Sequence, residues 1–394
     1  MKNFINKLAP IIFSFFIAVK YTGSFLPISL TYSLLALLFF GICIFQFSIL
    51  KKLSKESQFL SLWIVFIFFT LIYSEAFNYG VEKYVVVFSI YFSLFLYVPN
   101  MKKDFSKYIK SIFFIFLSIS VYLVLFDYSS IQKMVFFGES GGRYRITSDL
   151  NSNVISVFFS LGLISSILCT KVFKRGLKII SLFSTILFAV LLFFTGSRGA
   201  LLSVILAFTV FYLVYKFKKT IKTSFLYLSL IVISLIIGSF IINIAVDFLP
   251  TYLDGFINSR YTSEESLASL NARLFLYTLA FQGFSDGNFF DMLFGHGYGS
   301  FGYLLTNSDS RGYPHNIFLE ILYEMGLLSL FLFLYLIRKI FYYNSKLTKV
   351  KLNINQISIF VLFYFLFFNS MSTGDMASNF LLFSIMLVLF ESKK

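Results

Sequence analysis

The amino-acid sequence predicts an all-α, polytopic integral membrane protein with about twelve transmembrane helices. Hydrophobic residues make up 58% of the 394 residues and charged residues only 13%, and the mean hydropathy is +0.84. Uncharged apolar runs of spanning length recur along the whole chain, which is more apolar surface than a soluble domain buries. The residue-by-residue alternation of a membrane barrel is missing, so the sequence favours helices as the spanning structure.

The apolar runs predict twelve helices in order, near residues 8–20, 25–50, 59–74, 81–98, 108–127, 150–170, 176–195, 199–215, 223–247, 316–337, 354–371 and 376–391. The first run follows Lys2 and Lys7, as in a signal peptide. It lacks a small-residue cleavage site and another span follows at once, so we interpret it as a transmembrane helix. No low-complexity linker divides the chain, and we expect a single membrane domain over residues 1–394.

The connecting segments differ in charge from one side of the membrane to the other. If the N-terminus is inside, 24 of the 33 basic residues fall on the inner segments. This positive-inside asymmetry predicts that both termini are cytoplasmic. Most of the net charge of +15 is therefore a property of the topology. We expect no nucleic-acid partner.

Two long segments are predicted on the outer side, and the larger one joins helices nine and ten. Within this loop, residues 248–314, apolar residues recur at steps of three and four. This spacing predicts one apolar face of a helix that lies along the membrane surface as part of a cap over the site. The recurring residues of this face are Leu267, Leu270, Leu274, Tyr277 and Phe281.

Cys43 and Cys169 lie in separate apolar runs and are expected to be core residues.

Arginine is concentrated on the predicted outer side. Six of the nine basic residues there are arginine, against two of the 24 inside. Guanidinium is preferred to ammonium where a phosphate or carboxylate is bound through two hydrogen bonds. A lipid-linked phosphate or pyrophosphate would fit this preference, although each arginine has the alternative of pairing with an outer acidic residue. The nine basic residues are Lys20, Lys83, Lys133, Arg143, Arg145, Arg198, Arg260, Arg273 and Arg311.

Two of these arginine positions have favourable surroundings for an anion. Arg198 lies between glycines in a short turn between two apolar helices, where the backbone can approach a ligand and the next helix presents its amides. Simple snorkelling to the interface is the alternative, which lysine would satisfy equally well. Arg143 and Arg145 lie in a glycine-rich outer loop and are further candidates for phosphate binding.

Both histidines lie in the polar stretch that follows Pro250. His315 comes directly before the tenth predicted helix, where it is a candidate general base toward a hydroxyl group. A helix-capping or interfacial histidine is the alternative. His296 lies in a glycine-rich turn and is expected to be a loop residue that lines the site. The histidines lack a nearby acid at ligand spacing, so no metal site is predicted.

The tenth predicted helix carries polar residues on one ridge. Asn316, Glu320 and Glu324 are spaced by four residues. Carboxylates that enter an apolar helix are costly unless they are paired, so we expect them to face the bundle and meet a cation such as Arg198 or Arg273. With His296 and Arg311, these three residues are predicted to support the site.

Three motifs together resemble the bacterial O-antigen polymerases and ligases, which share a membrane fold. The motifs are TGSRGALL at residues 195–202, SLNARLFLY at 269–277 and PHNIFLEILYEMGLL at 314–328. The expected topology and the large outer loop agree with this resemblance. It implies a metal-independent, inverting glycosyltransferase without a cofactor, whose donor and acceptor are oligosaccharides linked to polyprenyl pyrophosphate. Arg198 and Arg273, with Arg143 and Arg145, would bind the pyrophosphate, and His315 would lie at the acceptor hydroxyl.

The resemblance also implies a location and further alternatives. The chain would be an inner-membrane protein of a bacterium, with its site on the periplasmic side and membrane lipid around it. We favour a polymerase of the Wzy type for surface polysaccharide and keep a ligase that transfers the glycan to lipid A core as the alternative. A chain-length regulator is a further candidate partner. A flippase or other transporter is disfavoured because transporters place their charges near the midplane on broken helices, whereas the candidates here cluster in outer segments.

Overall fold

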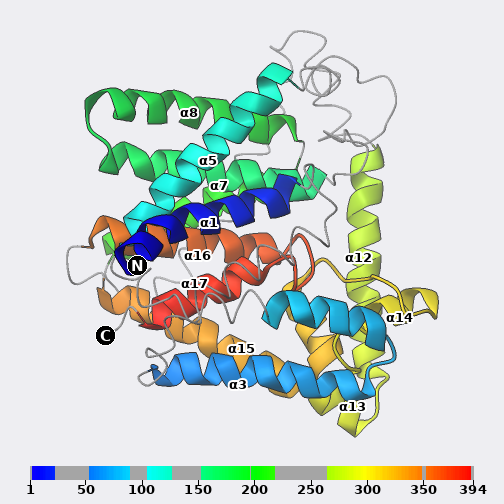
Figure 1. The fold of residues 1–394 in the computed structure, drawn as a ribbon. Helices are drawn as coiled ribbons and strands as arrows, with labels where there is room; N and C mark the ends of the chain where they lie inside the picture. Colours follow the sequence, from blue (N-terminus) through cyan, green and yellow to red (C-terminus); the bar gives the residue numbers. More distant parts are fainter. Residues whose placement is uncertain are drawn as a thin grey trace.

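The computed structural model describes residues 2–22, 53–88, 104–126, 152–195, 197–217, 264–347 and 352–391 (Figure 1). The predicted all-α class is confirmed, since these residues form helices and contain no strand. Ten of the twelve expected spans are helical in whole or in part. The other two, 25–50 and 223–247, lie outside the described residues, so the count of twelve stays a prediction. The helices are α1 (Lys2–Thr22), α3 (Lys55–Thr70), η2 (Leu71–Tyr73), α5 (Phe105–Phe126), α7 (Ser152–Val172), α8 (Arg175–Phe194), α9 (Arg198–Phe217), α12 (Glu264–Ser285), α13 (Phe289–Phe294), α14 (Phe301–Thr306), α15 (Ile317–Leu347), α16 (Ile354–Ser370) and α17 (Phe380–Glu391), with a further helical stretch at 77–88.

Most of the long helices run along one common direction and form a bundle (Figure 1). Five helical segments of the described chain are long and apolar enough to cross a membrane: Lys55–Tyr73, Phe105–Leu125, Asn153–Val172, Arg175–Phe193 and Ile317–Asn344. Three shorter apolar helices, Arg198–Val214, Ile354–Ser370 and Phe380–Glu391, accompany them. The chain is therefore built as a multi-pass membrane protein.

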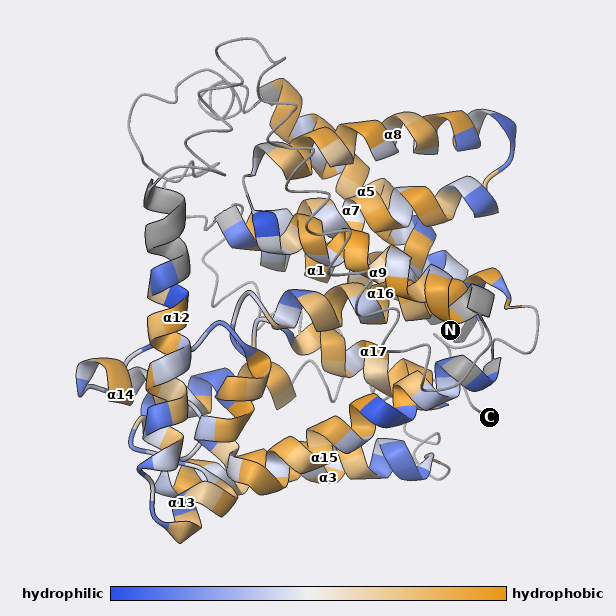
Figure 2. Ribbon diagram, turned by 180° about the vertical axis from the view of Figure 1, so that it is seen from behind, coloured by the Kyte–Doolittle hydropathy of each residue, from blue (hydrophilic) through white to orange (hydrophobic). Residues whose placement is uncertain are grey.

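The two ends of the bundle differ in character. The backbone amide of Ser54 donates to the Glu391 carboxylate at 2.7 Å, which joins the beginning of α3 to the end of α17. The first residues of α1 lie at this same end (Figure 1). Hydrophilic residues gather at the helix termini there (Figure 2). The opposite end carries α12, α13 and α14.

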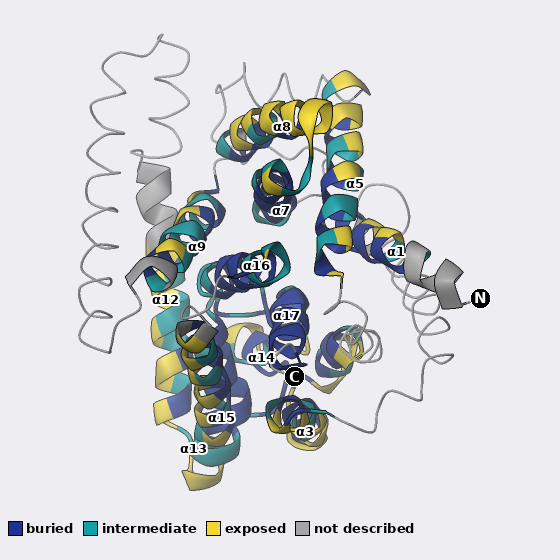
Figure 3. Ribbon diagram, turned by 90° about the vertical axis from the view of Figure 1, so that its left-hand side faces the viewer, coloured by how far each residue is buried: buried dark blue, intermediate teal, exposed yellow. Residues whose placement is uncertain are grey.

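The core of the bundle is a continuous apolar cluster that extends from α1 to α17. Helix α7 lies at its centre, packed against α1, α5, α8, α9 and α16, and Cys169 on this helix is buried as expected. Viewed along the bundle, buried residues line the middle, whereas α8 and α3 expose their outer faces (Figure 3). Trp63 of α3 is buried between Phe333 of α15 and Phe383 of α17, with ring centroids 5.6 and 5.5 Å away. These aromatic contacts fix α3 against the last helices.

Helix α12 covers the segment of the predicted surface helix, whose contact with a membrane stays a prediction. It is a continuous helix over the predicted apolar repeat, and it runs across the end of the bundle rather than along it (Figure 1). Ala280 of α12 packs with Phe301 of α14 and Tyr323 of α15 in a small core that is separate from the main one. The outer segment thus folds as a cap with its own apolar centre.

Helix α15 is broken at Gly326, which sequence periodicity did not predict. Gly326 has φ 73° and ψ −176°, a backbone conformation that only glycine adopts readily. A Cβ atom at this position would lie 2.4 Å from the backbone carbonyl carbon of Leu293. The amides of His296 and Gly297 donate to the carbonyl oxygens of Tyr323 and Glu324, each at 3.0 Å. These amides belong to the glycine-rich loop at residues 295–299, which therefore satisfies carbonyl groups at the break.

We expect Gly326→Ala to destabilise the fold by about 1–3 kcal/mol, because a side chain is strained at this φ and ψ and meets the backbone of Leu293. Leu327→Ala, one residue further on, is the control for general effects of substitution in α15. Thermal unfolding in detergent measures both variants. Equal unfolding temperatures for Gly326→Ala and the wild type would contradict the break described above.

Candidate functional site

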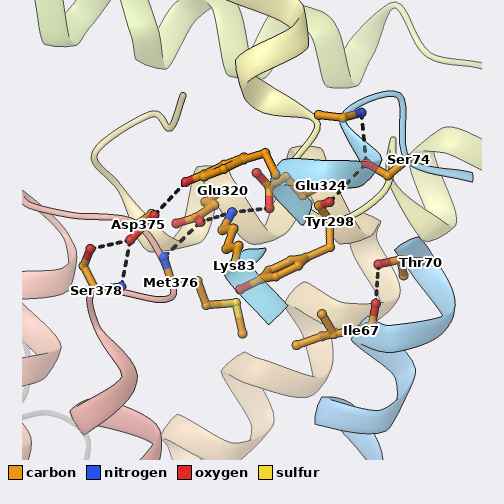
Figure 4. A network of polar contacts seen from close by, with 12 residues as sticks. Ile67, Thr70, Ser74, Lys83, Tyr298, Glu320, Glu324, Asp375, Met376 and Ser378 are labelled. Atoms are coloured by element: carbon orange, nitrogen blue, oxygen red, sulfur yellow. Dashed lines mark hydrogen bonds and ion pairs between the residues drawn. The ribbon is translucent and has the colours of Figure 1, made fainter. Parts of the chain in front are cut away.

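A buried ion cluster lies at the capped end of the bundle (Figure 4). Lys83, from the helical stretch 77–88, places its Nζ atom 2.6 Å from Glu320 Oε1 and 2.6 Å from Glu324 Oε2. All three side chains have no exposed surface. Ionised groups in an apolar interior are strongly destabilising unless they are paired. The two carboxylates therefore depend on this one lysine.

This cluster confirms one part of the sequence interpretation and corrects another. Glu320 and Glu324 face the interior of the bundle from one ridge of α15, as expected. The cation that they meet is Lys83 rather than Arg198 or Arg273. The reason is the packing of the helix 77–88 against the first half of α15, a contact between segments that are 241 residues apart along the chain.

Backbone amides complete the coordination of the two glutamates. Glu320 Oε1 also accepts from the amide of Met376 at 2.9 Å, and the amide of Gly299 hydrogen-bonds to Glu324. Met376 lies in the turn between α16 and α17, and Gly299 lies in the glycine-rich loop. The cluster thus joins α15 to two loops that are distant in sequence.

Asp375 extends the cluster by one more carboxylate. It accepts from the hydroxyl of Tyr79 at 2.9 Å and from the amide of Ser378 at 2.7 Å, and the Ser378 hydroxyl donates to it as well. Burial by itself would raise the pKa of Asp375, but Lys83, Ser378 and Arg311 together lower it below its usual range. Asp375 is therefore ionised at neutral pH and attracts the nearby cations.

The segment from Ser74 to Lys83 is packed directly against the glycine-rich loop. Ser74 Oγ donates to the carbonyl oxygen of Tyr298 at 3.1 Å, and Lys83 Nζ lies 4.4 Å from the centre of the Tyr298 ring. Gly299 has φ 89°, and a Cβ atom there would lie 2.7 Å from the Cα of Gly80. Glycine is required because the two backbones touch.

Arg311 connects this interior to the surface. Its guanidinium hydrogen-bonds to the hydroxyl of Tyr79, which in turn donates to Asp375. It also hydrogen-bonds to Tyr313 and lies 5.4 Å from the centre of the Tyr313 ring. Asp309, two residues earlier, accepts from the amides of Asn78 and Tyr79 at 2.8 and 3.0 Å. Arg311 thus links the buried cluster to Tyr313 through charge and hydrogen bonds, and its supporting role at a reaction site stays a prediction.

His315 lies beside Arg311 through a shared aromatic neighbour. The imidazole packs edge-on against the Tyr313 ring, with centroids 4.5 Å apart. Its backbone has φ 57°, in the left-handed region that is uncommon for residues other than glycine. Asn316 Oδ1 accepts from the amides of Phe318 and Leu319 at 3.0 and 3.3 Å, so Asn316 caps α15. His315 is therefore held at the mouth of this helix, half-buried.

His296 has a structural environment. Its Nε2 atom lies 3.1 Å from the carbonyl oxygen of Gly283 in α12, and its ring stacks on Tyr323 with centroids 4.5 Å apart. Together with its backbone bond to Tyr323, these contacts fasten α12 to the broken part of α15. The expectation that His296 is a loop residue is confirmed, and its contacts explain why a histidine is useful there.

The predicted pyrophosphate-binding arginines are placed as follows. Arg198 is the first residue of α9 and is exposed, and the adjacent Gly199 faces Ser372 in the turn that carries Asp375. Arg273 is half-buried on α12, about 15 Å along the helix from Gly283, given the rise of an α-helix. Arg143 and Arg145 lie outside the described residues. Phosphate binding by these four arginines stays a prediction.

Sequence patterns missed three members of the cluster, namely Tyr79, Lys83 and Asp375. Lys83 counts among the outer basic residues of the predicted topology, although it falls within the apolar run 81–98. Its placement inside that run, next to Glu82, was the available signal. Asp375 had a similar signal, as an isolated acid in the short turn between two apolar helices.

Comparison with known families supports the resemblance given by the motifs. Residues 183–334 match the family described as O-antigen ligase (Wzy_C). This match over residues 183–334 supports the O-antigen polymerase and ligase superfamily. No curated protein matches the chain. The matched segment, less than half of the chain, contains Arg198, Arg273, Arg311 and His315. Lys83 and Asp375 lie outside it, so the cluster joins matched and unmatched parts of the chain.

We expect Lys83→Met to destabilise the protein by about 3–5 kcal/mol, because it leaves two buried carboxylates without their cation. The variant Lys83→Met with Glu320→Gln and Glu324→Gln should recover much of this loss, since the buried charges are then removed together. Lys107→Met is the matched control. It breaks an exposed pair with Asp104 of the same 2.6 Å length and should change little. Thermal unfolding in detergent compares them, and equal effects at both lysines would contradict this account.

Proposed function

We propose that the protein is a glycosyltransferase that joins oligosaccharide units carried on polyprenyl pyrophosphate into a surface polysaccharide. The observation that carries the proposal is the O-antigen ligase family match, which spans Arg198, Arg273 and His315. The family fits a lipid-linked oligosaccharide donor, and the multi-pass helical bundle fits a substrate that stays in the membrane. We place the reaction at the periplasmic side of the bacterial inner membrane.

The proposed reaction is one substitution at an anomeric carbon. The acceptor hydroxyl attacks this carbon as His315 removes the hydroxyl proton, and the bond from the carbon to the pyrophosphate oxygen breaks. The leaving pyrophosphate takes the bonding electrons and so gains negative charge. Arginines that contact it would stabilise that charge as it develops. Attack from the face opposite the leaving group inverts the anomeric configuration.

Several contacts support these roles. His315 and Arg311 pack against the same ring, that of Tyr313, so a base and a guanidinium are close to each other at one surface. Strained backbone of the kind seen at His315 occurs often at functional sites. Arg198 lies at the start of α9, where the helix dipole adds positive potential. A donor sugar between Arg198 and His315 would have its leaving pyrophosphate at the arginine and the acceptor hydroxyl at the histidine.

A ligase is the second candidate, because the matched family is described as O-antigen ligase and its superfamily includes both activities. The two reactions share a donor and differ in the acceptor, which is a second lipid-linked unit for a polymerase and lipid A core for a ligase. We favour the polymerase, with a chain-length regulator as a further partner. The broken α15 and its buried charges are features that transporters share, so the test must also separate transport from transfer.

Deletion of the gene separates these functions, because each leaves a different product. Loss of a polymerase should leave lipopolysaccharide core with a single repeat unit. Loss of a ligase should leave bare core while lipid-linked polymer accumulates, and loss of a flippase should leave single units on the cytoplasmic face. Analysis of cell-surface lipopolysaccharide together with the lipid-linked pool distinguishes them. Unchanged polymer in the deletion strain would contradict the proposal.

We expect His315→Ala to reduce glycosyl transfer by about 10²–10⁴-fold, the usual contribution of a general base. His296→Gln is the matched control, because a glutamine amide can still donate to the Gly283 carbonyl oxygen. Complementation of the deletion strain, with chain length measured on gels and protein amount measured in membranes, compares the two. If His315→Ala supports full-length chains, or if both variants fail equally at normal protein levels, His315 is not the base.

A further inference from the structure

The cap exposes an apolar surface that its own core does not use. Phe289 and Phe290 begin the short helix α13, and they are 78% and 50% exposed. Asn288 and Asp291 form a capping box at the same helix end, so its backbone is well satisfied and the two rings are presented by an ordered turn. Two neighbouring exposed phenylalanines on an ordered element indicate a surface that is covered in the working protein.

This surface continues the exposed side of a candidate transmembrane helix. On α3, exposed apolar residues recur at steps of three and four, which is the pattern of a face in contact with lipid. Tyr73 ends this segment, and its ring packs edge-on against Phe290 with centroids 5.5 Å apart. Its hydroxyl donates to the carbonyl oxygen of Phe294 at 2.8 Å. The exposed face includes Leu62, Val65 and Phe69 of α3 and Ile72 of η2.

The position of α13 in the bundle agrees with contact to lipid. It lies at the end of the bundle that α12 crosses (Figure 1), and along the bundle axis it projects past α15 at the periphery (Figure 3). Figure 2 shows its hydrophobic residues at this edge. A helix at this place meets the boundary between hydrocarbon and headgroups, provided that α3 spans the bilayer.

We propose that α13 is an interfacial membrane anchor, in which Phe289 and Phe290 insert into the bilayer beside the end of α3. Aromatic rings are favoured at this depth, where one side is apolar and the other is hydrated. Asn288 and Asp291 remain on the hydrated side and cap the helix. Bilayer lipid is the occupant because the patch is continuous with the lipid-facing side of α3.

The anchor has a structural consequence for the cap. Helix α13 leads directly into the glycine-rich loop, whose amides hold the carbonyl groups at the break of α15. A membrane contact at Phe289 therefore fixes this loop at the level of the lipid headgroups. This inference depends on the packing of α13 and not on the reaction proposed above.

Tryptophan placed in the full-length protein tests the anchor. The chain has one native tryptophan, Trp63, which is buried, so its emission is subtracted by using the wild type. Phe289→Trp puts an indole in the patch, and Ser308→Trp puts one in the exposed polar turn after α14. In nanodiscs with lipids brominated near the headgroup, we expect Phe289→Trp to lose about half of its added emission and Ser308→Trp to lose little.

Equal and weak quenching at the two positions would overturn the proposal. A Phe289→Cys variant then identifies a different occupant. If it forms a disulfide-linked dimer in nanodiscs that hold two chains, a second copy covers the patch, and this result also overturns the lipid assignment. Both tryptophan variants are first compared with the wild type by thermal unfolding, so that a misfolded cap is not mistaken for a lack of contact.

Discussion

The ion pairs of Lys83 with Glu320 and Glu324 are the interaction on which the capped end of the bundle depends. Two carboxylates inside an apolar helix are strongly unfavourable, and a single lysine compensates both. The lysine can reach them only if the helix 77–88 packs against the first half of α15. This packing brings Ser74 and Gly80 onto the glycine-rich loop, so one electrostatic requirement places several segments that are far apart in sequence.

The break of α15 at Gly326 also holds the segment that carries Glu320 and Glu324 in place, through backbone hydrogen bonds. It separates the first part of α15 from the long apolar remainder, and the amides of His296 and Gly297 satisfy carbonyl groups there. The short first part is then held by side-chain charges on one side and by a loop on the other. His315 stands at its beginning, so its position follows from contacts made within the protein interior.

The hydrogen bonds around Arg311 also connect the segment that matches the family, residues 183–334, to parts of the chain outside it. The family match covers Arg198, Arg273, Arg311 and His315, whereas Tyr79, Lys83 and Asp375 lie outside it. Arg311 hydrogen-bonds to Tyr79, which donates to Asp375, and it contacts Tyr313 next to His315. The chemical groups at the surface are thus supported by residues from distant helices, which gives a fixed site on an otherwise apolar bundle.

The sequence by itself determined the membrane class, the approximate positions of the described helices, a helix over residues 267–281 and the burial of Glu320 and Glu324. These are local properties, because they follow from apolar run length and from spacing by four residues. Only the tertiary structure decided that Lys83 is their cation, that Asp375 and Tyr79 join it, and that α15 breaks at Gly326. Such contacts join residues up to 296 positions apart, and they depend on how helices pack, which local sequence patterns do not encode.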